Sequence, residues 1–189
     1  MNKIDYKNIY YPPGGILIWI LIILELITFG IALIVLALNS KENPIAFYKS
    51  SAHLNATYGA MNTVFLLTSG FFMATTVHQF KVGDLKKASL YLNITMFGGV
   101  LFLILKSIEY AEKIELGFTL GHDTFFNFYW LLTGFHVIHV LVGLVILLFM
   151  KRSFSKQTAN VEDVEASAAF WHMCDLIWLL LFPVLYLVF

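Results

Sequence analysis

The chain has 189 residues, of which 59% are apolar and only 13% are charged. A water-soluble domain usually carries about 25% charged residues, so this composition excludes a soluble globular protein. Lys and Arg together number 12, as do Asp and Glu, and this balance argues against a nucleic-acid binder. The single cysteine, Cys174, excludes an internal disulfide.

Five long apolar runs follow one another along the chain. Each is long enough for a membrane-spanning helix, which needs about 20 mostly apolar residues, and none has the short alternating segments of a β-barrel. We expect the first run to be retained, because it is too long for the core of a signal peptide. The connections are too short to hold a second domain. The sequence therefore predicts one all-α membrane domain over residues 1–189, with helices at about 16–38, 56–80, 90–111, 125–150 and 166–189.

The basic residues of the connections predict the orientation of the bundle. Because cytoplasmic loops carry an excess of Lys and Arg, the side that holds more of them is expected to face the cytoplasm. We therefore expect a cytoplasmic N-terminus and a periplasmic C-terminus. Eight basic residues fall on the first side and three on the other, namely Lys3, Lys7, Lys81, Lys86, Lys87, Lys151, Arg152 and Lys156 against Lys41, Lys49 and Lys113.

Glu25 is the only charged residue of the first run. An ionisable side chain in hydrocarbon is costly and usually faces the bundle interior, where a protonated carboxylic acid is its expected resting form. It is either a proton-exchange or lipid-head-group site or a neutral side chain hydrogen-bonded to a neighbouring helix. A small transporter that uses Glu25 for proton coupling is a further alternative, but the internal repeats typical of transporters are not evident.

The second and third runs contain groups suited to helix packing. Asn62, Thr68 and Ser69 are expected to form hydrogen bonds between helices, and the Gly98–Gly99 pair permits close approach of another backbone. Lys106 and Glu109 lie three residues apart, so they share a helix face and are expected to neutralise each other.

The fourth run carries one polar stripe, because its polar and small residues recur every three or four positions. Interhelical hydrogen bonds from His136 and His139 are the simpler interpretation. The alternative is a di-haem cytochrome or metal site that also uses His172, but histidines three apart on one helix cannot bind opposite faces of the same haem iron. The stripe consists of Tyr129, Thr133, His136, His139 and Gly143.

His172 and Asp175 in the last run again share one helix face, three residues apart. We expect a buried structural pair between two interfacial aromatic residues, Trp171 and Trp178. No nucleophile stands beside the pair, and no phosphate loop, zinc motif or nucleophile elbow occurs in the chain. The residues alone therefore predict no catalytic site, cofactor site or metal site.

Several of these stretches together resemble one family, subunit III of the haem–copper oxidases, from about residue 12 to 189. Residues 133–143 are similar to its T-G-F-H-x-x-H-V-x-x-G stretch, residues 171–178 to its W-H-x-x-D-x-x-W, and residues 62–70 to its N-T-x-x-L-L-x-S-G helix. Further positions that match the family in the same order are Glu25, His78, Gly83-Asp84 and Glu109-Tyr110.

The resemblance implies a non-catalytic subunit that binds catalytic subunit I and other subunits of a respiratory complex in a bacterial cytoplasmic membrane. It implies that phospholipid is bound, that haem and copper belong to partner subunits, and that proton uptake and durability of the catalytic subunit are supported. Glu25 would be the family's buried carboxylate, and the interior polar or lipid-cleft residues would be His136, His139, His172, Asp175, Glu109 and Asn62.

The chain departs from the mitochondrial type, which has two further helices at the start, and is similar to five-helix bacterial members. A lipid cleft that needs those two helices is therefore not expected in the same form. Residues 181–186 resemble relatives associated with nitric oxide reductases, and Pro183 is expected to kink the last helix. Cytochrome c oxidase, quinol oxidase and a nitric-oxide-reductase accessory protein remain open as parent complexes.

Overall fold

The computed structural model describes residues 12–188, and every regular element in that range is a helix. Five of the six helices are long and apolar enough to cross a membrane, which confirms the predicted fold class. The helices are α1 (Ile16–Glu42), α2 (Pro44–Ser51), α3 (Ala56–Lys81), α4 (Leu85–Glu115), α5 (Thr124–Lys156) and α6 (Val161–Tyr186).

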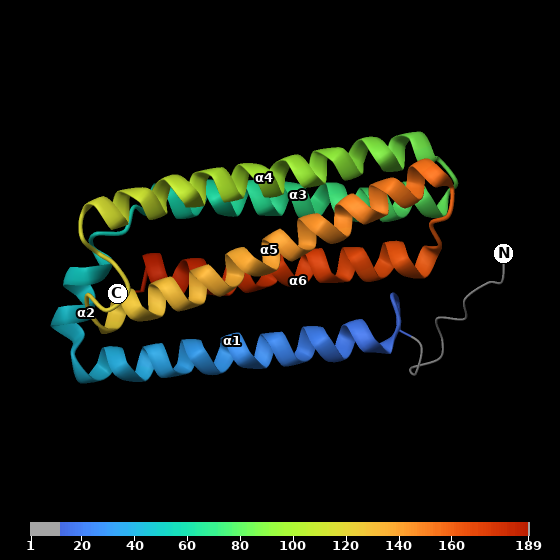
Figure 1. The fold of residues 1–189 in the computed structure, drawn as a ribbon. Helices are drawn as coiled ribbons and strands as arrows, with labels where there is room; N and C mark the ends of the chain where they lie inside the picture. The colour runs from blue at the N-terminus through green and yellow to red at the C-terminus, as the bar shows by residue number, and fades with distance from the viewer. Residues whose placement is uncertain (1–11, 189) are drawn as a thin grey trace.

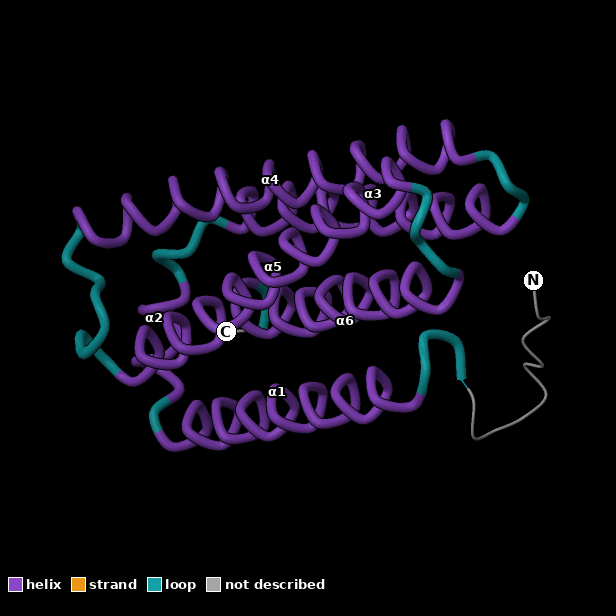
Figure 2. Tube along the Cα trace, turned by 45° about the vertical axis from the view of Figure 1, so that its right-hand side comes forward, coloured by secondary structure: helices purple, strands orange, loops and turns teal. Residues whose placement is uncertain are grey.

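The five long helices run side by side along one bundle, with the short α2 at one end (Figure 1). Figure 2 shows α1 along one side of this bundle, next to α6, while α3 and α4 form the opposite side. α6 contacts α1, α3 and α5, so it occupies the centre. α1 begins at one end of the bundle and α6 finishes at the opposite end, as expected for a chain that crosses the membrane five times.

The helices extend beyond the apolar runs that predicted them, because a polar cap rather than the hydrocarbon boundary sets where helical hydrogen bonding begins. α4 starts at Leu85 instead of about residue 90, since the Asp84 carboxylate accepts a hydrogen bond of 3.0 Å from the Lys87 backbone N–H. α6 starts at Val161 instead of about 166, since the Asn160 side chain accepts one of 2.7 Å from the Asp163 N–H.

The predicted connection between the first two runs contains α2, which the sequence analysis missed. α2 begins at Pro44 and has only eight residues, and Pro is favoured in the first turn of a helix because its missing N–H is not needed there. Phe47 is buried against the bundle, whereas Ile45 and Tyr48 are exposed. α2 therefore covers the end of the bundle with one face only.

Two tryptophans of α6 point into the core of the bundle and not toward its outer surface, where aromatic residues of an interface would meet lipid head groups. Trp171 and Trp178 are fully buried. Each indole N–H needs a partner when it is buried; Trp171 donates to Ser69 at 3.0 Å and Trp178 to Thr63 at 3.0 Å. These two bonds tie α6 to α3.

The two connections that are rich in Lys and Arg lie at the same end of the bundle. Which end faces the cytoplasm stays a prediction. The α3–α4 and α5–α6 connections meet at one end of the bundle, where Lys81 pairs with Glu165 at 2.5 Å. Lys3 and Lys7 lie outside the described residues. Pro183 lies inside α6, which continues to Tyr186.

Candidate functional site

The structure brings Glu25 of α1 against His139 of α5. Nε2 of His139 lies 3.3 Å from Oε2 of Glu25, although the contact does not have hydrogen-bond geometry. Nδ1 of the same ring lies 2.8 Å from the backbone oxygen of Phe135. Since a carbonyl oxygen only accepts, Nδ1 carries a proton. Nε2 therefore faces the Glu25 carboxyl group, and the two form a polar contact between α1 and α5.

Aromatic rings enclose this pair on the α1–α5 side. Phe29 is only 1% exposed and stacks on Phe135 at 5.4 Å, and Phe135 packs edge-on against His139 at 4.6 Å. The Glu25 side chain remains 24% exposed. Glu25 is therefore half-buried and opens toward the outside of the chain, unlike the fully interior group that the sequence predicted.

His136 does not form the interhelical hydrogen bond that we expected. Neither ring nitrogen has a hydrogen-bond partner among the described residues, although the side chain is fully buried. The ring stacks on Trp178 with 5.4 Å between centroids and meets Phe102 edge-on at 5.4 Å. In this position His136 acts as an aromatic packing residue.

His172 and Asp175 do lie together, but His172 is not buried as predicted. Nδ1 of His172 is 3.3 Å from Oδ2 of Asp175, and the two side chains are 45% and 9% exposed. The pair faces α3, where Gly70 leaves room for the carboxylate. The expectation of a buried pair therefore holds for Asp175 alone, because the His172 ring projects from the outer face of α6.

Lys106 and Glu109 form the expected pair, and three aromatic residues complete it. The Lys106 ammonium donates to Glu109 at 3.0 Å and to the hydroxyl of Tyr186 at 2.8 Å. The hydroxyls of Tyr129 and Tyr186 donate to the other Glu109 oxygen at 2.9 and 2.6 Å, and Trp178 places its ring 5.4 Å from the ammonium. The cluster joins α4, α5 and α6 with both charges fully buried.

The predicted hydrogen-bonding residues of α3 behave differently from one another. Ser69 donates to the Thr95 backbone oxygen of α4 at 2.7 Å, as expected. Thr68 is exposed, so its predicted interhelical role was wrong. Asn62 is fully buried, yet neither atom of its amide has a partner among the described residues.

The three histidines considered as ligands do not converge. His136 packs on Trp178, His139 meets Glu25, and His172 projects beside α3. In the range 12–188, no group of three or more His, Cys, Asp or Glu side chains lies close enough to hold a metal ion. The geometry therefore gives no support to the di-haem alternative.

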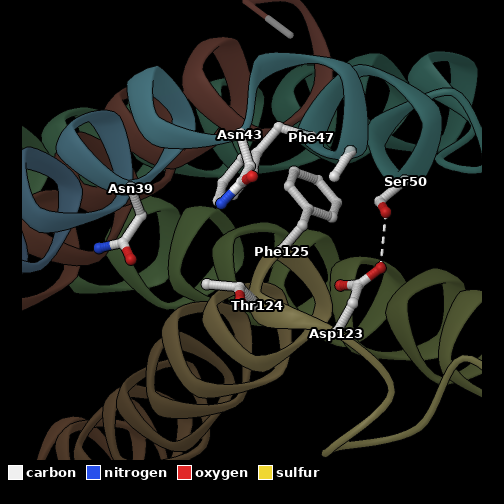
Figure 3. Close-up of a pocket in the computed structure, with 8 residues that line it drawn as sticks. Asn39, Asn43, Phe47, Ser50, Asp123, Thr124 and Phe125 are labelled. Carbon is white, nitrogen blue, oxygen red and sulfur yellow. Dashed lines mark hydrogen bonds between the residues drawn. The ribbon is translucent and has the colours of Figure 1, made fainter.

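A small pocket of about 120 Å³ lies at the end of the bundle between α2 and the start of α5 (Figure 3). Phe47 and Phe125 line it and meet edge-on at 5.8 Å. The Ser50 hydroxyl donates to one oxygen of Asp123 at 2.6 Å, and the other oxygen caps α5 by accepting from the Phe126 N–H at 2.7 Å. Because both oxygens are engaged, this carboxylate attaches α2 to α5.

Sequence reasoning missed the roles of three residues that complete these interactions, although it placed Tyr129 on the polar stripe of the fourth run. Tyr186 and Tyr129 supply both hydroxyls of the Lys106 cluster, and Thr63 accepts from Trp178. A buried charged pair in hydrocarbon needs further hydrogen bonds. Tyrosines at a similar membrane depth could therefore have been considered as partners of Lys106 and Glu109. Spacing within one helix does not show which tyrosine of another helix lies opposite.

Comparison with known proteins finds one protein family that matches most of the chain. The family model described as cytochrome c oxidase subunit III matches residues 50–188. The chain is 32% identical over 129 residues to cytochrome c oxidase subunit 3 of Osphranter robustus and 34% identical over 131 residues to that of Prototheca wickerhamii, in both cases over 67% of this chain and 48% of the relative. It is 28% identical over 139 residues to the Corynebacterium diphtheriae protein of the same name, over 72% of this chain and 68% of the relative. The chain thus spans about half the length of the first two relatives.

Proposed function

Because the chain belongs to the cytochrome c oxidase subunit III family, we propose that it is a non-catalytic subunit of a respiratory haem–copper oxidase in a bacterial cytoplasmic membrane. The family match over residues 50–188 carries this proposal. The five apolar helices support a multi-pass membrane protein. The share of the Corynebacterium diphtheriae relative that the chain covers, 68% against 48% for the other two, supports a bacterial form.

In this proposal haem and copper reside in partner subunits, with catalytic subunit I as the principal partner. The ionisable residues of the interior support a non-catalytic role, because they pair with one another. Glu25 and His139 meet across two helices at 3.3 Å, and the hydroxyl of Tyr186 contacts both Lys106 and Glu109. In this proposal the chain exchanges protons and stabilises the catalytic subunit, and the catalytic subunit carries out electron transfer.

The Glu25–His139 pair is the proposed proton-exchange site of the chain. One group is an acid and the other a base, and moving the proton between them changes no net charge. Since a separated charge in hydrocarbon is costly, a pair that redistributes its proton internally is suited to this depth. The 24% exposure of Glu25 gives a partner or water access to that proton.

Phospholipid is the other proposed ligand. The outer face of α1 exposes aliphatic side chains such as Leu24, Ile27 and Ile31, which fits contact with acyl chains. At the α5–α6 end, a hollow lined by Lys151, Arg152 and Lys156 is suited to anionic head groups, since basic residues near the membrane surface attract them. This end faces the cytoplasm in the proposed orientation.

Affinity purification of the tagged chain in mild detergent tests the proposal. We expect the preparation to contain haem-bearing chains and to show a Soret absorption band, while the chain separated from its partners is colourless. Oxygen consumption with reduced cytochrome c or with a quinol, and nitric oxide consumption, identify the branch. Recovery of a stable, correctly inserted chain that never co-purifies with haem would contradict the proposal.

Glu25→Gln tests the proton-exchange site within that complex. The amide keeps the size of the side chain but cannot release a proton, so we expect assembly to be preserved and the number of turnovers before inactivation to fall. Thr28→Val is a matched control on the same helix, because the Thr28 hydroxyl only bonds to the Leu24 backbone oxygen of α1. Equal lifetimes for Glu25→Gln, Thr28→Val and the wild type would remove this role.

A further inference from the structure

A groove between α3 and α6 opens on the outer surface of the bundle and contains ionisable side chains near the middle of the membrane. It has a volume of about 460 Å³ and is lined on one side by Leu67, Gly70 and Phe71 of α3, and on the other by His172, Asp175 and Leu176 of α6. Asp175 lies about 21 Å along α6 from Val161 and about 16 Å from Tyr186, at 1.5 Å per residue. The groove is therefore near mid-depth in a hydrocarbon layer about 30 Å thick.

The polar groups of the groove are only partly satisfied within the chain. Oδ2 of Asp175 faces Nδ1 of His172 at 3.3 Å, and Gly70 makes room for it, because a Cβ at that position would clash with the carboxylate. Oδ1 of Asp175 has no hydrogen-bond partner among the described residues, although the residue is only 7% exposed. The His172 side chain is 45% exposed and points outward.

The row of isoleucines on the outer face of α1 differs from the groove. On α1, the exposed residues Ile23, Ile27 and Ile31 are all aliphatic, which suits contact with lipid. An ionisable pair directed at acyl chains is costly, and such residues in membrane helices usually face protein or a water-filled cavity. The α3–α6 face therefore has the composition of an interior surface whose covering element belongs to another chain.

We propose that this groove is the docking site for a transmembrane helix of a partner chain, which presents a hydroxyl or carboxamide side chain at its midpoint. Such a group both donates and accepts, so it can bond to the outer nitrogen of the exposed His172 ring in either tautomer without adding a charge. A second ion would leave the pair unbalanced. The inference rests on the proposed function in that the partner belongs to the same complex.

The shape of the groove agrees with this occupant. Ala74 lines it one helical turn after Gly70 on α3, and a small exposed side chain allows another helix to approach closely in a membrane. Leu67, Phe71 and Leu176 flank the polar pair with apolar contact surface, and they are 47%, 67% and 43% exposed. A helix laid here would bury all three against its own apolar side chains.

A photo-crosslinking residue in place of Leu176 tests the proposal in the intact complex in native membranes. We expect it to link to a membrane helix of a partner chain with Ser, Thr, Asn or Gln near the middle of the linked segment. His172→Leu should lower the yield of this product about tenfold, in the range expected for one interhelical hydrogen bond and its packing. Because His172→Leu also removes the contact of Nδ1 with Asp175, the melting temperature of each variant in detergent is measured beside the yield, and the tenfold loss should exceed any loss of folded chain. His78→Leu is the matched control, because His78 is also exposed but lies near the end of α3, and its yield should stay at the wild-type level.

The outcomes separate this inference from the proposed function. A product with a helix of a haem-free complex supports the docking site and contradicts the oxidase assignment. Co-purification of haem together with links from position 176 only to lipid, or only to a second copy of this chain, overturns the docking site and leaves the oxidase assignment standing. Equal yields with His172 and with His172→Leu also overturn the docking site.

Discussion

The Lys106–Glu109 cluster and the His172–Asp175 pair both place an acidic beside a basic residue three positions apart on one helix, but they differ in how completely the chain satisfies them. In the cluster both charges are fully buried, and the ammonium and both carboxylate oxygens have partners. At mid-depth, Asp175 keeps one oxygen unpartnered and His172 is exposed. A completed cluster holds helices of one chain together, whereas an incomplete one indicates contact with a group outside the chain.

The largest expected effect comes from breaking the completed cluster. Glu109→Leu leaves the Lys106 ammonium buried without its counter-charge, and removal of one partner of a buried pair costs about 3–5 kcal/mol of unfolding free energy. Thermal unfolding of the chain in detergent measures this loss. The double variant Lys106→Met with Glu109→Leu should recover most of it, because no charge then remains. Wild-type stability of Glu109→Leu alone would show that the pair does not hold the helices.

A smaller loss is expected where helix backbones meet. A Cβ at Gly98 would lie 2.8 Å from the Cβ of Ser69 and 3.1 Å from the Phe65 backbone oxygen, so Gly98→Leu should force α3 and α4 apart and cost about 1–3 kcal/mol, as overpacking usually does. Gly134→Leu is the control, since nothing lies within 4 Å of a Cβ there. Comparable melting temperatures for the two variants would contradict the close α3–α4 approach.

The two histidines of α5 should differ in their effect on stability. His139→Leu removes the contact with Glu25, and interhelical polar contacts in membranes are worth about 0.6 kcal/mol on average. His136→Phe should be neutral or slightly stabilising, because Phe keeps the packing on Trp178 and removes two nitrogens that have no partner within residues 12–188. Unfolding midpoints of both variants in the same detergent decide this; a larger loss for His136→Phe would reverse the assignment.

The smallest effect concerns Asp84, which lies between the membrane-spanning helices. The hydrogen bond from the Lys87 backbone N–H, with help from the Lys87 ammonium, holds the pKa of this carboxyl below its usual value. A group whose pKa is lower in the folded state stabilises the fold above its unfolded pKa and loses this contribution as pH falls through the folded pKa. The start of α4 should therefore loosen on acidification, seen as faster amide exchange near Lys87. Asp84→Asn should abolish this dependence, and an unchanged acid response in that variant would contradict the assignment.

The same contrast shows what the sequence can and cannot predict. The five membrane helices followed from the apolar runs, and the Lys106–Glu109 pair followed from spacing on one helix, because both are local properties. The partners of His136 and Asn62 depend on which helices become neighbours and at what rotation, and spacing carries no such information. The exposure of His172 was missed for the same reason. α6 is covered by other helices on most of its sides, and only the packing of the bundle shows which face remains exposed. α2 was missed because eight residues give too short a pattern.

The most direct measurement compares two variants in two states, the chain alone in detergent and the assembled complex in its membrane. We expect Glu109→Leu to lower the melting temperature in both states, because its cluster is complete within the chain. We expect His172→Leu to lower the melting temperature of the chain alone far less than Glu109→Leu does, since only the contact with Asp175 at 3.3 Å is lost, and to weaken its retention in the complex. If His172→Leu destabilised the isolated chain as much as the complex, the α3–α6 pair would be an internal packing element, and the contrast between completed and incomplete polar groups would fail.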